Sequence, residues 1–221
     1  MFLAIDTNGL PNTVQGFDPV VCALALASFD GVRVEAAGGL VRQPRYMIDH
    51  PYTYGALLAN GLTADAISSA ELTVDEAAAR LRAHLGQRRP RGYHGLFVER
   101  VMAHAPWSFR SYEWGDPVMP EAAMAIHGGK VAVKLVEGRT VKAVKPKRAL
   151  VSLDDACAWA TERGFDVTGP NGETKPWTPS SGVLHCLDRV VRTAKLAGAL
   201  TRSGAVETAR KAAEESSWLM V

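Results

Sequence analysis

The pattern of apolar and polar residues divides the chain into a strand-rich start and a helix-rich remainder. Three apolar runs open the chain, at residues 2–6, 20–28 and 32–41. Asp30-Gly31 separates the second run from the third, and this dipeptide is typical of a tight turn between strands. We therefore expect an antiparallel meander of three strands.

After the meander, apolar residues recur with the period of helices. The clearest helix start is Thr73 with Glu76 three residues later, a capping-box pattern that predicts a helix over residues 74–85. Similar spacing predicts further helices at residues 54–62, 64–70, 96–104, 118–126, 153–163, 184–200 and 205–215. Between the helices we expect short strands at residues 92–94 and 108–114, and a loop at residues 166–182. The pattern indicates an α/β fold whose mixed sheet has an antiparallel and a parallel half, flanked by helices.

The segment of residues 128–148 differs in composition from the rest. Apolar and polar residues alternate on both sides of Glu137-Gly138, which predicts a β-hairpin. The segment holds seven basic residues and one acid, so the formal charge of +2 conceals a basic hairpin on a mildly acidic body. Such a hairpin is either a solvated edge that resists aggregation or an arm that follows a nucleic-acid backbone. In the second interpretation the contacting residues are Lys130, Lys134, Arg139, Lys142 and Lys145.

Composition narrows the class of protein. A chain of 221 residues with 47% hydrophobic residues can bury a core and is not disordered. No apolar run reaches the roughly 18 residues that a transmembrane helix needs, and the start does not read as a signal peptide. Cys22, Cys157 and Cys186 are too far apart for a CxxC zinc site. We expect them to be small core residues in a reducing compartment, hence a cytoplasmic protein without a membrane partner.

Three separated segments carry a family resemblance. They are AIDTNGLP at residues 4–11, GYHGLFVER at residues 92–100 and HCLDRVVRTAKL at residues 185–196. In this order they resemble the motifs of the DnaQ-like 3′–5′ exonucleases of the DEDD superfamily. The resemblance covers about residues 1–200. It implies a ribonuclease H-like fold for residues 1–203, with residues 128–148 as an inserted hairpin and residues 204–221 as a C-terminal helical tail.

The resemblance also implies a chemistry. Enzymes of this family remove nucleotides from the 3′ ends of single-stranded DNA or RNA with two Mg²⁺ or Mn²⁺ ions, which acidic residues hold. Carried over to this sequence, the metal ligands are Asp6, Glu99 and Asp188, and His185 is the general base.

The sequence departs from the family at every motif. The glutamate expected two residues after Asp6 is missing and Asn8 lies nearby, while Glu99 replaces an aspartate. Arg189 stands where the family has its catalytic aspartate, and Asp188 points about 100° away around a helix. Because a guanidinium competes with metal ions for carboxylates, two hypotheses follow. The protein is either a metal-dependent exonuclease, weakened in activity, or a metal-free pseudo-nuclease that binds nucleic acid or another protein.

Several residues have both a binding and a structural interpretation. Arg189, Asn8 and His94 are candidates for contact with nucleic acid, and Arg189 would hold a phosphate where the family holds a metal. Asp188 has a simpler interpretation, an ion pair with Arg192 one turn on, which we favour.

Two tryptophans extend this list of candidates. Trp177, in a proline-rich loop, either stacks on a base or plugs the core. The C-terminal Trp218-Leu219-Met220 is expected to dock on the body or on a protein partner.

Overall fold

The computed structural model describes residues 1–9, 19–103, 107–109, 113–127, 133–136, 139–143, 151–170, 174–177 and 183–218. Its strands are β1 (Phe2–Thr7), β2 (Val21–Phe29), β3 (Val34–Leu40), β4 (Val133–Val136), β5 (Arg139–Ala143) and β6 (Thr174–Pro176). Its helices are α1 (Arg45–Ile48), α2 (Pro51–Ala59), α3 (Ala64–Ser68), α4 (Val74–Leu85), α5 (Gly95–Met102), α6 (Val118–His127), α8 (Leu153–Thr161), α9 (Leu184–Ser203) and α10 (Ala205–Trp218). Within these residues, no helix combines the length and the apolar character needed to cross a bilayer.

The predicted meander is confirmed. β1 pairs antiparallel with β2, and β2 pairs antiparallel with β3, so β2 is the central strand of the three. β1 is buried along its whole length, and β2 is buried except at its last two residues. The apolar runs at the start of the chain therefore form the antiparallel strands of the mixed α/β fold.

The prediction of a parallel half of the sheet is largely wrong. Residues 92–94 form no strand; a single parallel bridge joins Phe2 to Arg91, with the Leu3 N–H donating to the Arg91 carbonyl at 2.8 Å. The reason is the length of this segment, because α5 begins at Gly95 and leaves no room for a strand after Pro90. The described residues of 108–114 are not a strand either.

A parallel strand does form at the opposite edge of the sheet. β6 pairs in parallel with residues 36–38 of β3. β6 lies inside the segment that we expect to be a loop. Its three residues, next to prolines, are too few to show the alternation that identifies a strand in the sequence.

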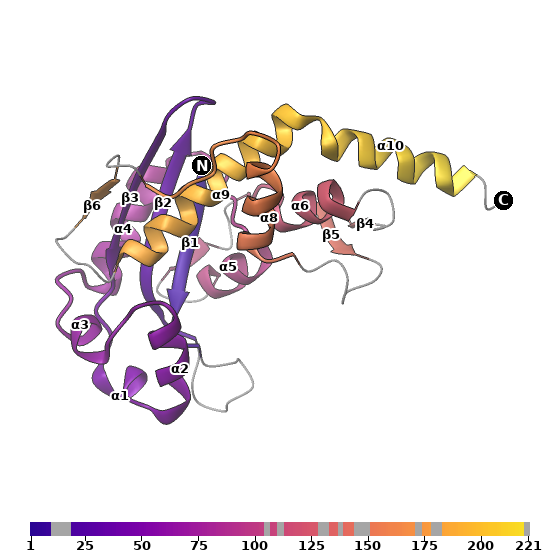
Figure 1. The fold of residues 1–221 in the computed structure, drawn as a ribbon. Helices are drawn as coiled ribbons and strands as arrows, with labels where there is room; N and C mark the ends of the chain where they lie inside the picture. Colours follow the sequence, from indigo (N-terminus) through magenta and orange to yellow (C-terminus); the bar gives the residue numbers. More distant parts are fainter. Residues whose placement is uncertain are drawn as a thin grey trace.

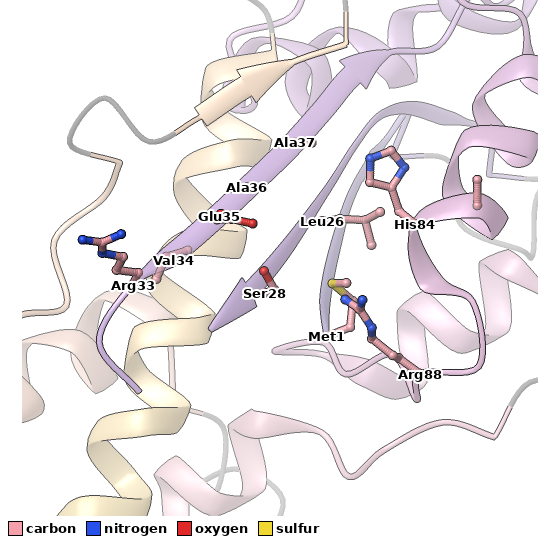
Figure 2. Close-up of a pocket in the computed structure, with 11 residues that line it drawn as sticks. Met1, Leu26, Ser28, Arg33, Val34, Glu35, Ala36, Ala37, His84 and Arg88 are labelled. Atoms are coloured by element: carbon pink, nitrogen blue, oxygen red, sulfur yellow. The ribbon is translucent and has the colours of Figure 1, made fainter. Parts of the chain in front are cut away.

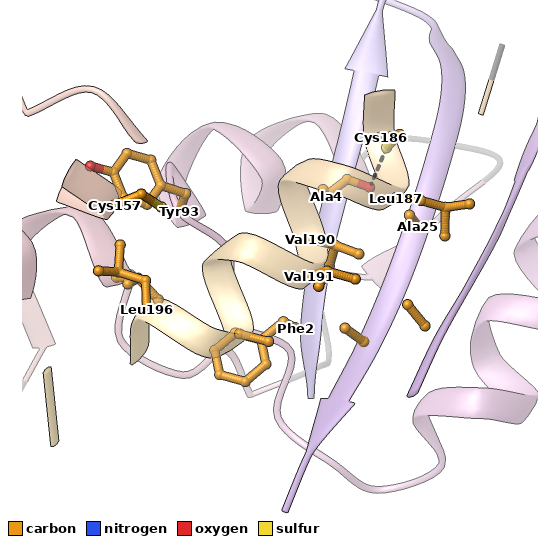
Figure 3. Close-up of a cluster of buried hydrophobic side chains, with 14 of the residues drawn as sticks. Phe2, Ala4, Ala25, Tyr93, Cys157, Cys186, Leu187, Val190, Val191 and Leu196 are labelled. Atoms are coloured by element: carbon orange, nitrogen blue, oxygen red, sulfur yellow. Dashed lines mark hydrogen bonds between the residues drawn. The ribbon is translucent and has the colours of Figure 1, made fainter. Parts of the chain in front are cut away.

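Helices cover both faces of the sheet, because alternate residues of a strand point to opposite sides. Phe2 and Ala4 belong to the cluster beneath α9, whereas Leu3 and Ile5 belong to the cluster beneath α4 and α5. Figure 1 shows α9 crossing the sheet. Figure 3 shows Leu187, Val190 and Val191 of this helix directed at the strands. The sheet is therefore the middle layer of three.

The predicted helices are present. α4 has the predicted bounds, and α9 extends three residues beyond the prediction to Ser203, where Gly204 at φ +65° ends it. The other ends differ from the predictions by a few residues, and the short α1 was not predicted. All three cysteines are buried and free, as expected of small core residues.

The predicted hairpin and tail also form. β4 pairs antiparallel with β5, and the register places Lys134 opposite Lys142. Lys130, Lys145 and the predicted turn Glu137-Gly138 lie outside the described residues. α10 packs against α6 and α9 near its start and then extends away from the body (Figure 1). Leu219 and Met220 lie outside the described residues.

The capping box of α4 yields a testable prediction. The Thr73 hydroxyl accepts a hydrogen bond from the Glu76 N–H at 3.2 Å, and the Glu76 carboxylate accepts one from the Thr73 N–H at 2.8 Å. Thr73→Ala removes the first bond and weakens the cap, so we expect a loss of about 1 kcal/mol in the free energy of unfolding. Urea denaturation followed by circular dichroism measures it. Thr208→Ala, on an exposed stretch of α10, is the control and should change stability by less than about 0.5 kcal/mol.

Candidate functional site

The candidate site is centred on Asp6, near the end of β1. The alternation along the strand turns Phe2, Ala4 and Asp6 towards α9. The Asp6 side chain is fully buried, with 0% of its surface exposed. A carboxylate at such a depth requires partners that compensate its lost hydration.

Two side chains of α9 supply these partners. Arg189 donates from Nη1 to Oδ1 of Asp6 at 2.6 Å, and Nδ1 of His185 lies 3.3 Å from Oδ2. His185 and Arg189 are four residues apart, and this spacing places them on the same face of a helix. Their side chains are 37% and 32% exposed, so the cluster opens to solvent on its basic side only. Both carboxylate oxygens of Asp6 are thus engaged by nitrogen donors.

His94 borders this cluster from α5. Partial desolvation, followed by the charge of Arg189, lowers the pKa of His94. Both effects favour the neutral imidazole. His94 precedes the first residue of α5 and its ring meets the Tyr93 ring edge-on, with 5.0 Å between centroids. The contacts of the cluster itself join two separate elements, β1 and α9.

Two thiols lie close to Asp6 without joining its chemistry. Burial and, secondly, the charge of Asp6 raise the pKa of Cys22 to about 12. The same two causes raise the pKa of Cys186, whose thiol donates to the Ala4 carbonyl at 3.4 Å (Figure 3). The raised pKa values favour the protonated form of both thiols at neutral pH, which is a poor nucleophile.

Asp188 lies outside the cluster. Its carboxylate lies 3.5 Å from Arg192, which also binds Asp154 of α8 at 2.6 Å. The Asp188 carboxylate also packs so closely on Gly169 that a Cβ at that glycine would come within 2.0 Å of Oδ1. The favoured structural interpretation of Asp188, an ion pair one turn along the helix, is confirmed.

The donor set does not fit the two metal ions that the sequence resemblance implies. Within the described ranges, no three His, Cys, Asp or Glu side chains gather into a metal-binding group, so Asp6, half-buried Glu99 and Asp188 do not meet at one point. Asp6 itself is bound to a guanidinium, and a two-metal site needs several carboxylates free to face the ions. No hydrolytic step through a metal is derived for this arrangement.

Two residues that were predicted to contact nucleic acid, Asn8 and Trp177, are not part of this cluster. Asn8 is fully buried; its Nδ2 donates to the Met47 carbonyl at 3.0 Å and its Oδ1 accepts from the Val20 N–H at 3.2 Å. A nucleic acid does not reach this side chain, which joins the residue after β1 to Val20 and Met47.

Trp177 lies on the other face of the sheet. It follows β6 and packs against the cluster beneath α4, where its ring contacts that of His84 with 5.4 Å between centroids. The sheet separates it from Asp6, so it does not stack a base beside this site. This position agrees with the interpretation of Trp177 as a side chain that plugs the core.

The sequence placed Arg189 near the carboxylates as a competitor of metal ions and His185 in the same site; it did not show that both side chains bind Asp6. The available signal was the four-residue spacing of the two basic residues on one predicted helix face. The sequence matches no protein-family model and no curated protein. Chemically, the cluster offers a neutralised carboxylate with two partly exposed basic side chains, which suits the binding of an anion.

Proposed function

We propose that this chain is a 3′–5′ exonuclease-like protein that binds the 3′ ends of single-stranded nucleic acid without two-metal hydrolysis. The observation that carries this proposal is the 2.6 Å ion pair between Arg189 and the buried carboxylate of Asp6. It supports the pseudo-nuclease hypothesis because a fixed guanidinium occupies the carboxylate that would otherwise hold a divalent ion.

The strand arrangement supports a ribonuclease H-like sheet as part of the proposal. β3, β2 and β1 follow one another in an antiparallel row, and the parallel bridge of Phe2 to Arg91 continues that row beyond β1. α9 covers β1, where Asp6 lies. The supporting feature is this combination of a meander, a parallel contact next to β1 and a C-terminal helix that faces the first acid.

The basic side of the cluster supports phosphate binding. A guanidinium has five N–H donors, of which Arg189 uses Nη1 for Asp6. With about a third of its side chain exposed, Arg189 has further donors for a phosphodiester oxygen. His185 adds a second nitrogen group on the same helix, within 3.3 Å of Asp6.

The hairpin β4–β5 supports contact with the backbone further from the 3′ end. Its register places Lys134 opposite Lys142, so two cations share one rung. Each phosphate contact that a single strand makes releases counterions and makes binding salt-dependent.

The first test separates binding from cutting. The purified protein is incubated with 3′-labelled single-stranded DNA and RNA in Mg²⁺, in Mn²⁺ and in EDTA, beside the size-matched variant Asp6→Asn. We expect salt-sensitive binding and no shortening of the label in any of the three. Shortening that requires both the metal ion and Asp6 overturns the proposal in favour of an active exonuclease.

The second test assigns the residues that neutralise phosphates. The slope of log K against log salt should become shallower by up to about 1.4 in Lys134→Gln/Lys142→Gln, about 0.7 for each phosphate that a lysine no longer neutralises. Arg100→Gln/Lys211→Gln removes the same charge from exposed positions of α5 and α10, and should leave the slope unchanged. Equal slopes for both double variants remove the hairpin from the proposal, and an absence of any binding leaves a protein-interaction module instead.

A further inference from the structure

A groove of about 700 Å³ opens on the face of the sheet opposite to Asp6. Its floor is made of β2 and β3, where Leu26 pairs with Ala37 and Ser28 pairs with Glu35 across the strands. Its wall is the end of α4 and the following turn, with His84 and Arg88. Figure 2 shows Leu26, Ser28 and Glu35 on the sheet side and His84 and Arg88 across from them. This volume lies within the range of small-molecule sites.

The floor changes from apolar to polar along the strands. Leu26 is 2% exposed and Ala37 is partly exposed, so the accessible apolar surface at this end is mainly that of Ala37. The next cross-strand pair outward, Ser28 and Glu35, offers a hydroxyl and a carboxylate. A planar ring with amine groups at its edge fits this order of chemistry, because its face covers Ala37 while its N–H groups donate to the polar pair.

The charged groups of the groove have no ion-pair partners within the described part of the chain. Neither Arg33, Arg88 nor Glu35 makes a salt bridge there, although Arg89, Arg91, Arg189 and Arg192 all do. His84 is oriented by a hydrogen bond from Nδ1 to the Arg80 carbonyl at 2.8 Å, which leaves Nε2 for another partner. Arg33 and Arg88 against Glu35 give the groove a positive balance that favours an anion.

From this lining we infer that the groove binds a small organic anion with a planar, amine-bearing ring and a phosphate or carboxylate group. The ring lies on Ala37, its N–H groups donate to Ser28 and Glu35, and the anionic group binds Arg88. The site is separated from the Asp6 cluster by the sheet and needs no nucleic-acid binding by that cluster.

Adenosine monophosphate is the probe for the test, with ribose 5-phosphate as the ligand that lacks the ring. Titration into the full-length ¹⁵N-labelled protein should shift the amides of Leu26, Ala37 and Ala83. Ribose 5-phosphate should bind at least about tenfold more weakly, because it leaves the apolar floor uncovered. Equal affinities for the two ligands, or no binding of either, overturn the inference.

Two variants and two controls localise the site. Arg88→Gln should weaken binding of adenosine monophosphate about tenfold or more, since it removes a charge-assisted contact. Ala37→Leu should weaken it by filling the floor, and both variants should keep the wild-type melting temperature within a few degrees. Arg100→Gln, an exposed arginine outside the groove, should bind as the wild type does. Loss of binding in Arg189→Gln together with unchanged binding in Arg88→Gln places the ligand at the Asp6 cluster and overturns the inference.

Discussion

Replacing Arg189 with methionine is expected to lower the free energy of unfolding by about 3 kcal/mol or more. Methionine keeps much of the length of the side chain but removes the cation from a carboxylate whose surface is 0% exposed. A buried charge that loses its partner retains the cost of its desolvation, which is larger than the value of the contact itself. Urea denaturation followed by circular dichroism gives the change.

The matched control is Arg192→Met on the same helix. Arg192, like Arg189, forms ion pairs with carboxylates. Its partners Asp154 and Asp188 are 81% and 37% exposed, so both regain water when the arginine is removed. We expect a loss of about 1 kcal/mol or less for this variant. The double variant Asp6→Asn/Arg189→Met should recover part of the stability lost in Arg189→Met, since it removes the unpaired charge. Equal losses in Arg189→Met and Arg192→Met would falsify the buried ion pair as an anchor of α9.

The second large effect is expected for Leu187→Ala. Leu187 is fully buried in the cluster between α9 and the sheet, with Val190, Val191 and Ala4 in the same cluster (Figure 3). Truncation removes the transfer free energy of the side chain and leaves a cavity, which together cost about 2–5 kcal/mol. The thermal midpoint and the urea midpoint should both fall.

Leu184→Ala makes the same chemical change three residues earlier on α9. Leu184 is 56% exposed, so its truncation should change the free energy of unfolding by no more than about 0.5 kcal/mol. A comparable loss in both variants would show that α9 does not face the sheet with the side that carries Leu187. Because His185 and Arg189 depend on the same orientation of α9, that result would also remove the candidate site.

The sequence alone was sufficient for the elements whose signals are local. The capping box at Thr73, the apolar alternation of the meander and the helical spacing from Leu184 onward each depend on residues only a few positions apart. Local periodicity and capping chemistry act within a helix turn or a strand, so they are visible in any stretch of sequence. The ion pair of Asp188 with Arg192 was accessible for the same reason, because its partners are one turn apart.

The tertiary structure decided which residues that are far apart in the sequence come into contact. Arg189 and Asp6 are 183 positions apart, and only the packing of α9 on β1 turns the guanidinium towards the carboxylate. The same is true of β6, too short to carry its own pattern, and of Trp177, whose face of the sheet depends on where that strand pairs. The groove at Leu26 and Arg88 likewise joins residues of β2, β3 and the turn after α4. The sequence determined the meander and the main helices, because their signals depend on neighbouring residues. The fold determined which charges meet, because that choice depends on how separate elements pack.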